Sequence, residues 1–246
     1  MHACRRSIPA VSDPATSPLL DVADLQAGYG RSQVLFGLSL GVPQTGAVAI
    51  LGRNGAGKTT LLKTLAGEIR PSAGSIRLAG EDVTAAPAER RARLGIGHVP
   101  QEHAIFARMS VRENLMLGAG PRADRRAIEE VLEFFPKLGA RLGQTAATLS
   151  GGERKMLAIG RALLGKPRVL MLDEPTEGVW IGVIDEIAER LIDLSRRMSV
   201  ILVEQHVELA LTVAQAAYVI DRGTVALSGP ADHVRNDPAL LRLLAP

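Results

Sequence analysis

The segment that most restricts how this chain can fold is Gly-Arg-Asn-Gly-Ala-Gly-Lys-Thr at positions 52–59. It fits the pattern G-x-x-x-x-G-K-[S/T], in which the glycines let the main chain curl until its N–H groups face inward and form an anion site. The aliphatic run 47–51 precedes it, and a helix is expected over Lys58–Ala66. A buried strand, a glycine-rich loop and a helix whose positive end faces that loop together predict a phosphate-binding site.

The residues of this loop have separate expected roles. Lys58 adds a positive charge for the outer phosphates, and the Thr59 hydroxyl is suited to Mg²⁺. A glycine-rich turn that arose by chance is the alternative, and the flanking strand and helix argue against it. The residues expected to bind nucleotide through this loop are Gly52, Arg53, Asn54, Gly55, Ala56, Gly57, Lys58, Thr59 and Thr60.

Two carboxylates follow a second aliphatic run. Residues 169–172 read Val-Leu-Met-Leu, and Asp173 and Glu174 come next. Because ligands of open α/β sheets bind at the carboxyl ends of the strands, we expect Asp173 to hold Mg²⁺ and Glu174 to orient or deprotonate an attacking water. Alone, such a pair is more often the start of a solvated loop, but the phosphate-binding loop favours the functional interpretation.

Hydrophobic patterning predicts the remaining elements. Strands are expected over 20–27, 34–42, 47–51, 75–78, 169–172, 200–203, 217–221 and 224–228, and helices over 58–66, 181–198 and 207–214. The stretch 88–164 is expected to be mostly helical and to form an inserted lobe. Strands that alternate with helices predict an α/β fold with a mostly parallel sheet and helices on both faces.

Composition narrows the possible functions. The net charge is only +3, and no cluster of basic residues is interleaved with aromatic ones, which argues against nucleic-acid binding. The single cysteine, Cys4, excludes a disulfide within the chain. No apolar run reaches the length that spans a membrane, so a partner would have to supply any spanning part. Residues 1–18 lack the apolar middle region of a signal peptide and predict a disordered leader, with one large domain over 19–246.

A Ser-Gly-Gly sequence opens a further helix. Such a start exposes N–H groups and a hydroxyl to an anion, although a plain helix cap is the simpler interpretation of an isolated instance. Here the sequence is Leu-Ser-Gly-Gly-Glu at 149–153, which resembles the LSGGQ signature of ABC ATPases with Glu in the last place. The resemblance covers essentially all of 20–229.

The resemblance implies an architecture and a set of site residues. The expected fold is an α/β P-loop NTPase core with an antiparallel β subdomain and an inserted helical subdomain at about 88–164. Tyr29 matches the aromatic that stacks on adenine, Gln101 the glutamine that links Mg²⁺ to the partner interface, and His206 the histidine that contacts the γ-phosphate. In this family two cassettes pair head to tail, and the signature closes over the ATP of the other copy; the signature residues are Ser150, Gly151, Gly152 and Glu153.

Four stretches resemble the smaller ATPase subunit of branched-chain amino acid importers and of the related urea and amide importers: 51–55, 105–115, 173–178 and 202–206. Gln101 is more typical of the urea branch, because the amino acid branch often carries Glu there. Trp180 and Ile181 stand where this branch usually has a small residue and proline, and ordinary packing at the start of the next helix is the simplest interpretation of Trp180. A soluble ABC ATPase acting on ribosomes or DNA ends, or an export ATPase, remains the alternative class.

An importer subunit of this kind implies particular partners. They are two integral-membrane permease subunits, a second ABC ATPase in a heterodimer (a homodimer being the alternative) and a periplasmic solute-binding protein, with the cassette in the cytoplasm, peripheral on the inner face of the membrane. Solute contacts would lie in those partner chains. The apolar pair Ile105 and Phe106, in an otherwise polar segment after Gln101, predicts either a docking groove for a permease helix or filling of the helical lobe.

Overall fold

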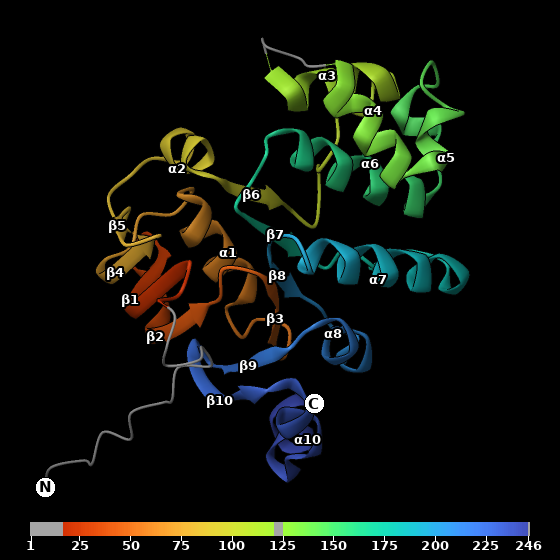
Figure 1. The fold of residues 1–246 in the computed structure, drawn as a ribbon. Coiled ribbons are helices and arrows are strands. Elements are labelled where there is room, and N and C mark those ends of the chain that lie inside the picture. The colour runs from red at the N-terminus through yellow and green to blue at the C-terminus, as the bar shows by residue number, and fades with distance from the viewer. Residues whose placement is uncertain (1–16, 121–124, 246) are drawn as a thin grey trace, which may run out of the picture.

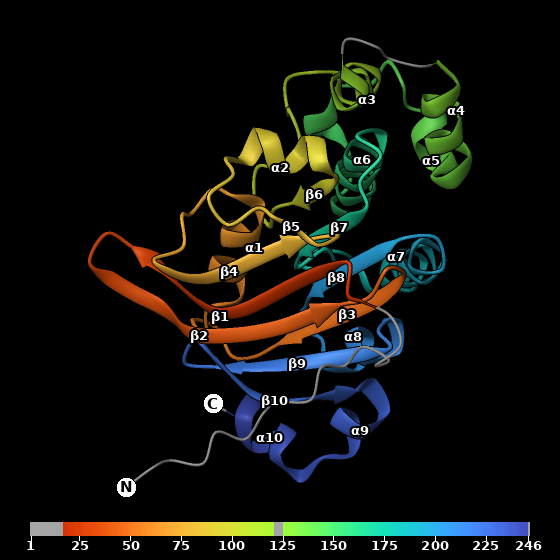
Figure 2. The same cartoon turned by 60° about the vertical axis from the view of Figure 1, so that its left-hand side comes forward.

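A computed structural model describes residues 17–120 and 125–245 of the chain. Most of the predicted leader, residues 1–16, lies outside the described residues. Two β-sheets and the helices packed on them make up the described part (Figures 1 and 2). Among the described helices, none combines the length and the apolar character that crossing a bilayer requires.

The larger sheet has six strands in the order β10-β9-β3-β8-β7-β6. Strands β6, β7, β8, β3 and β9 run parallel, and β10 pairs antiparallel with β9 at one edge. Every residue of β7 and β8 is buried, as expected for strands covered by helices on both faces. The strands are β3 (Gly46–Leu51), β6 (Ile96–Val99), β7 (Val169–Asp173), β8 (Ser199–Val203), β9 (Ala216–Asp221) and β10 (Thr224–Pro230).

The smaller sheet is antiparallel, with the order β2-β1-β4-β5. Helix α1 (Lys58–Ala66) contacts strands of both sheets, and its Leu61, Leu62 and Leu65 share one buried cluster with residues of each. The phosphate-binding loop therefore leads into a helix held between two layers. The strands are β1 (Leu20–Tyr29), β2 (Ser32–Val42), β4 (Ala73–Leu78) and β5 (Glu81–Asp82).

Helices cover the other face of the larger sheet. Alternate side chains of β7 divide between the two cores: Leu170 and Leu172 face these helices, whereas Val169 and Met171 face α1. The helices are α6 (Gly151–Leu164), α7 (Ile181–Ser195) and α8 (Val207–Val213). Together with α6, the helices α3 (Val111–Ala119), α4 (Arg125–Phe134) and α5 (Pro136–Gly139) gather at one end of the molecule, opposite α9 (Ala231–Asn236) and α10 (Pro238–Leu244) (Figure 1).

The predicted start of the helical lobe, at residue 88, is wrong. Helix α2 (Ala88–Leu94) is followed by β6, which pairs in parallel with β7. Gly97 and His98 interrupt the aliphatic pattern of this strand, so its pairing with β7 decides its conformation. The helix expected over 181–198 ends at Ser195, and the other predicted strands and helices are confirmed to within about two residues at each end.

Candidate functional site

The glycine-rich loop connects β3 to α1 at the carboxyl end of the larger sheet. Gly52 adopts φ 148°, and a Cβ atom there would collide with the carbonyl oxygen of Ile220 in β9. Only glycine fits this approach of loop to strand. The residues predicted to bind nucleotide thus form one continuous turn from Gly52 to Thr60, with α1 beginning at Lys58.

Lys58 is buried inside this turn. Its Nζ donates hydrogen bonds to the carbonyl oxygens of Gly52 at 2.7 Å and of Arg53 at 3.0 Å. Burial lowers the pKa of the Lys58 ammonium, while Glu174 and Asp173 act in the opposite direction. The positive charge is therefore held at the curl of the loop and lies within reach of the acidic end of β7.

Asp173 ends β7 with only 2% of its surface exposed. Burial raises the pKa of its carboxyl group, and the nearby Thr59 hydroxyl opposes that shift. Within the described residues, neither carboxylate oxygen accepts a well-formed hydrogen bond. Two buried oxygens without partners next to a hydroxyl are the hard ligands that Mg²⁺ takes, so Asp173 and Thr59 fit the ion that the sequence predicts.

Glu174 sits in a left-handed backbone conformation, with φ 49°. Its Oε2 accepts hydrogen bonds from the Nε2 atoms of Gln101 at 3.0 Å and of Gln205 at 2.7 Å. The Gln101 amide also donates to Glu177 Oε2 at 2.8 Å. The structure thus brings the Gln101 amide to the carboxylates of Glu174 and Glu177, whereas the resemblance implies a link from Gln101 to Mg²⁺.

Two further residues hold the turn after β7, and the sequence analysis assigned neither to the site. Lys155 of α6 donates through Nζ to the main-chain oxygen of Glu174 at 2.9 Å, and burial lowers its pKa. The carboxylate of Glu204, at the end of β8, accepts from the main-chain N–H of Thr176 at 2.9 Å and from its hydroxyl at 2.6 Å. The sequence offered one signal that Glu204 belongs to the site, namely its position directly after an aliphatic strand.

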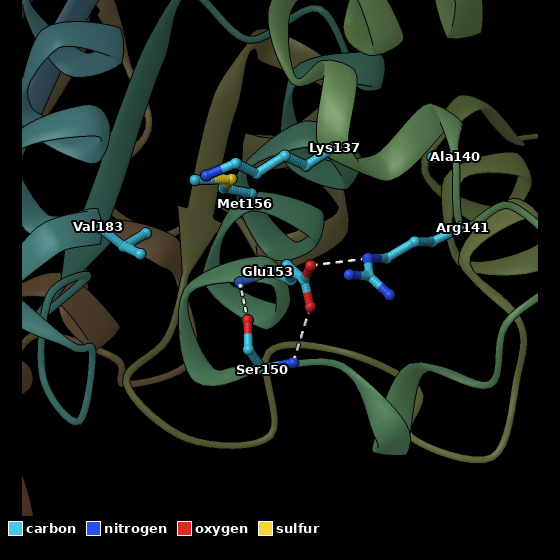
Figure 3. A pocket seen from close by; sticks show the side chains of 7 residues that line it. All are labelled: Lys137, Ala140, Arg141, Ser150, Glu153, Met156 and Val183. Carbon is cyan, nitrogen blue, oxygen red and sulfur yellow. Dashed lines mark hydrogen bonds and ion pairs between the residues drawn. The ribbon is translucent and has the colours of Figure 1, made fainter.

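The Ser-Gly-Gly segment opens α6 as a capping box (Figure 3). Ser150 Oγ accepts from the Glu153 N–H at 3.3 Å, and Glu153 Oε2 accepts from the Ser150 N–H at 2.9 Å. Arg141 pairs with the other Glu153 oxygen at 2.7 Å, beside a pocket of about 460 Å³ that Ser150 and Val183 also line. Ser150 is exposed, so the helix start is open to a phosphate brought by another molecule.

Both signature glycines pack against the segment that follows the acidic turn. A Cβ atom at Gly151 would lie 2.8 Å from the carbonyl oxygen of Gly178, and one at Gly152 would lie 2.6 Å from Cγ1 of Val183. This contact accounts for the glycines within the chain itself. It also ties the open end of α6 to the start of α7.

The structure places three other singled-out residues on the surface. Tyr29 is half exposed at the tip of β1. His206 is exposed at the N-cap of α8, and the amide that reaches Glu174 belongs to its neighbour Gln205. Trp180 is 74% exposed, and its ring lies beside Gly182 in the first turn of α7, so packing at the start of that helix leaves most of the side chain in solvent.

Comparison with known proteins agrees with this geometry. The family described as ABC transporter matches residues 35–177. The high-affinity branched-chain amino acid transport ATP-binding protein BraG of Pseudomonas aeruginosa is 42% identical over 81% of this chain and 87% of its own length. The probable branched-chain amino acid transport ATP-binding protein LivF of Archaeoglobus fulgidus is 37% identical over 88% of this chain and 94% of its own.

Two other similarities are informative. The lipopolysaccharide export system ATP-binding protein LptB of Haemophilus influenzae is 36% identical over 92% of this chain and 96% of its own length. A crystal structure of the ADP conformation of an ATP-binding cassette superposes with a TM-score of 0.83 at 25% identity, over 93% of this chain and 98% of that one. Fold, site and sequence therefore agree: the chain belongs to the ABC transporter family, as one of its ATP-hydrolysing subunits.

Proposed function

We propose that this chain energises the uptake of branched-chain amino acids through partner permeases. The similarity to BraG over 81% of the chain carries the choice of solute class. The chemistry of the subunit follows from the acidic end of β7, where Asp173 and Glu174 lie beside the loop that buries Lys58. Membrane subunits, a second ATPase and a periplasmic solute-binding protein complete the proposed importer, with this chain on the cytoplasmic face.

Each residue of the site has a role in this proposal. Lys58 and the N–H groups of its loop hold the phosphates, and Tyr29 stacks on the adenine. Thr59 and Asp173 hold Mg²⁺, which neutralises phosphate charge when bound. Glu174 accepts a proton from the attacking water, and Ser150 of a second cassette closes the site from the other side.

The test of this assignment is Glu174→Gln. The amide keeps the shape of the side chain but cannot accept a proton, so hydrolysis should slow by about 10²–10⁴-fold while ATP and Mg²⁺ still bind. Light scattering should then show a doubled mass in ATP, because the closed pair persists when the nucleotide is not cleaved. Turnover at the wild-type rate would remove Glu174 from the role of base.

The solute requires a separate experiment. Uptake of radiolabelled leucine should be lost when the gene is deleted and should return with the wild-type chain but not with Lys58→Ala. The similarity to LptB makes lipopolysaccharide export the second candidate. Gln101 makes urea or amide import the third. Unchanged leucine uptake in the deletion strain, with a loss of outer-membrane lipopolysaccharide or of urea uptake, would select one of these instead.

The permease contact is proposed at Phe106. This side chain is 52% exposed, and the Arg161 guanidinium lies 4.9 Å from its ring centre. Buried Asn114 bonds both the N–H and the carbonyl oxygen of Phe106 and so fixes the loop. Ile105, in contrast, is partly buried against the helical lobe.

The two neighbours therefore provide a matched pair of variants. Phe106→Glu should abolish transport while the purified chain stays folded and binds ATP, because the ring faces solvent. Ile105→Glu should lower the melting temperature, since it places a charge in an apolar contact. If Phe106→Glu also unfolds the chain, the ring is part of the lobe and the docking site lies elsewhere.

A further inference from the structure

We propose that Gln205 positions Glu174 for hydrolysis, in place of the neighbouring His206 that the sequence pattern selected. Gln205 Nε2 lies 2.7 Å from Glu174 Oε2, the shorter of the two amide contacts to that oxygen. Gln205 and its neighbour His206, the N-cap of α8, are both exposed, and the amide of Gln205 is the one that contacts Glu174. The inference rests on the proposed role of Glu174 as the base and concerns how that base is held.

The two amides reach Glu174 from different strands. Gln101 follows β6 and Gln205 follows β8, and these strands flank β7, whose end carries the carboxylate. Both amides bond the same oxygen, Oε2, so neither of these two bonds occupies Oε1. Because the carboxylate is held from both sides, it is already oriented before nucleotide binds. Less conformational entropy is then lost when the reacting groups are brought into position.

Gln205 is itself held by its surroundings. Its main-chain N–H donates to Oε2 of the buried Glu204 carboxylate at 3.1 Å. The other oxygen of Glu204 accepts both bonds from Thr176, two residues after Glu174. The end of β8 and the turn after β7 are thus fastened together by one carboxylate. This anchoring fixes the distance from which the Gln205 amide reaches Glu174.

The chemistry of an amide suits this position. A carboxamide donates a hydrogen bond but carries no charge and does not titrate between pH 5 and 8. The orientation of the Glu174 side chain therefore does not depend on the protonation of an imidazole. Gln205 acts through Glu174 and is a positioning residue.

The first test compares variants of the full chain in Mg²⁺-ATP. Gln205→Ala should lower kcat by about 10- to 100-fold, the range seen when the partner that orients a reacting group is lost. The KM for ATP should stay within about twofold, because Gln205 touches the base and not the phosphate-binding loop. Gln205→His keeps an N–H donor and should recover part of the lost kcat, whereas Gln205→Glu, of equal size without a donor, should not. Gln44 is exposed, and its side chain donates to the carbonyl oxygen of Ser17. Gln44→Ala therefore serves as the control, and its kcat should equal that of the wild type.

The second test is a double-mutant cycle. If Gln205 acts through Glu174, adding Gln205→Ala to Glu174→Gln should cause no further loss in single-turnover hydrolysis. Losses that multiply would overturn the inference, as would a wild-type kcat in Gln205→Ala or a larger loss in His206→Ala than in Gln205→Ala. An unimpaired Glu174→Gln variant would instead overturn the proposed role of the base, so the two failures are distinguishable.

Discussion

At the scale of single residues, the site holds a deeply buried carboxyl group. Asp173 is 2% exposed, and burial raises the pKa of its carboxyl group. A carboxyl group whose pKa is higher in the folded than in the unfolded state contributes stability at pH values below the unfolded pKa. That stability is lost as pH rises through the folded pKa. The ionised side chain at neutral pH therefore lowers the stability of the nucleotide-free protein, while it provides a cation site.

This argument predicts that Asp173→Asn stabilises the protein without nucleotide. Removing this buried charge should raise the free energy of unfolding at pH 7 by about 1–3 kcal/mol. The advantage should shrink as pH is lowered and the wild-type carboxyl group becomes protonated. Denaturant unfolding at pH 7 and pH 5 measures both effects. Mg²⁺-ATP should raise the melting temperature of the wild type and not of the variant; a variant less stable than the wild type at pH 7 would contradict the prediction.

At the scale of elements, α1 is held at its end by a buried arginine. Arg91 of α2 is 1% exposed, and its guanidinium donates to the carbonyl oxygens of Thr64 and Leu65 at 2.6 and 2.9 Å. It also bonds the carbonyl oxygens of Ala86 at 3.0 Å and Thr84 at 2.9 Å. These carbonyl groups include two in the last turn of α1, where the regular helical hydrogen bonds end.

Arg91→Leu should therefore lower the free energy of unfolding by about 3 kcal/mol or more, because two buried and two partly buried carbonyl groups lose a charged donor. Its neighbour Arg90 is the matched control. Arg90 forms an exposed ion pair with Glu81, so Arg90→Ala should change stability by about 0.5 kcal/mol or less. Urea unfolding of both variants decides the point, and equal effects at the two positions would count against a structural role for Arg91.

The contact between α6 and α7 is a second element-scale feature. Gly152→Ala would place a methyl group 2.6 Å from Cγ1 of Val183. We expect a loss of about 1–3 kcal/mol from overpacking. Val183→Ala in the same chain should recover much of that loss by making room. Thermal unfolding of Gly152→Ala and of the double variant measures both changes in stability. Gly143→Ala is the control, because a Cβ atom at Gly143 meets nothing within 4 Å.

At the scale of the whole molecule, the two features that the sequence predicts to bind phosphate belong to different elements. Lys58 lies in the loop between β3 and α1, whereas Ser150 opens α6 beside a pocket lined by Arg141 and Val183. In the proposed two-fold pair of cassettes, the loop of one copy and the start of α6 of the other would form one site, so that pairing would complete both sites at once.

Mixing two inactive chains tests the pairing. Lys58→Ala keeps its signature segment and Ser150→Arg keeps its phosphate-binding loop, so a mixed dimer contains one composite site with both halves intact. Random pairing of equal amounts should then restore about one quarter of the wild-type turnover. A crosslinked sample that contains mixed dimers yet stays inactive would argue against independent composite sites. If neither chain pairs with the other, the test is repeated with the second ATPase of the proposed importer.

The sequence alone determined the features that depend on local chemistry. The glycine spacing of 52–59 specifies a curled loop, and the aliphatic runs that become β3, β7 and β8 specify buried parallel strands, because these patterns depend on nearby residues only. The carboxylates at the end of β7 and the capping box at Ser150 could be predicted for the same reason.

Only the tertiary structure decided which distant side chains meet. Strand β6 has a weak pattern of its own and becomes a strand because β7 supplies its hydrogen-bond partners. Lys155 and Glu204 join the turn after Glu174 because α6 and β8 pack beside it. A one-residue difference, Gln205 or His206, changes which side chain points at the carboxylate where β8 ends, and that direction follows from the packing of the strand rather than from the identity of the residue.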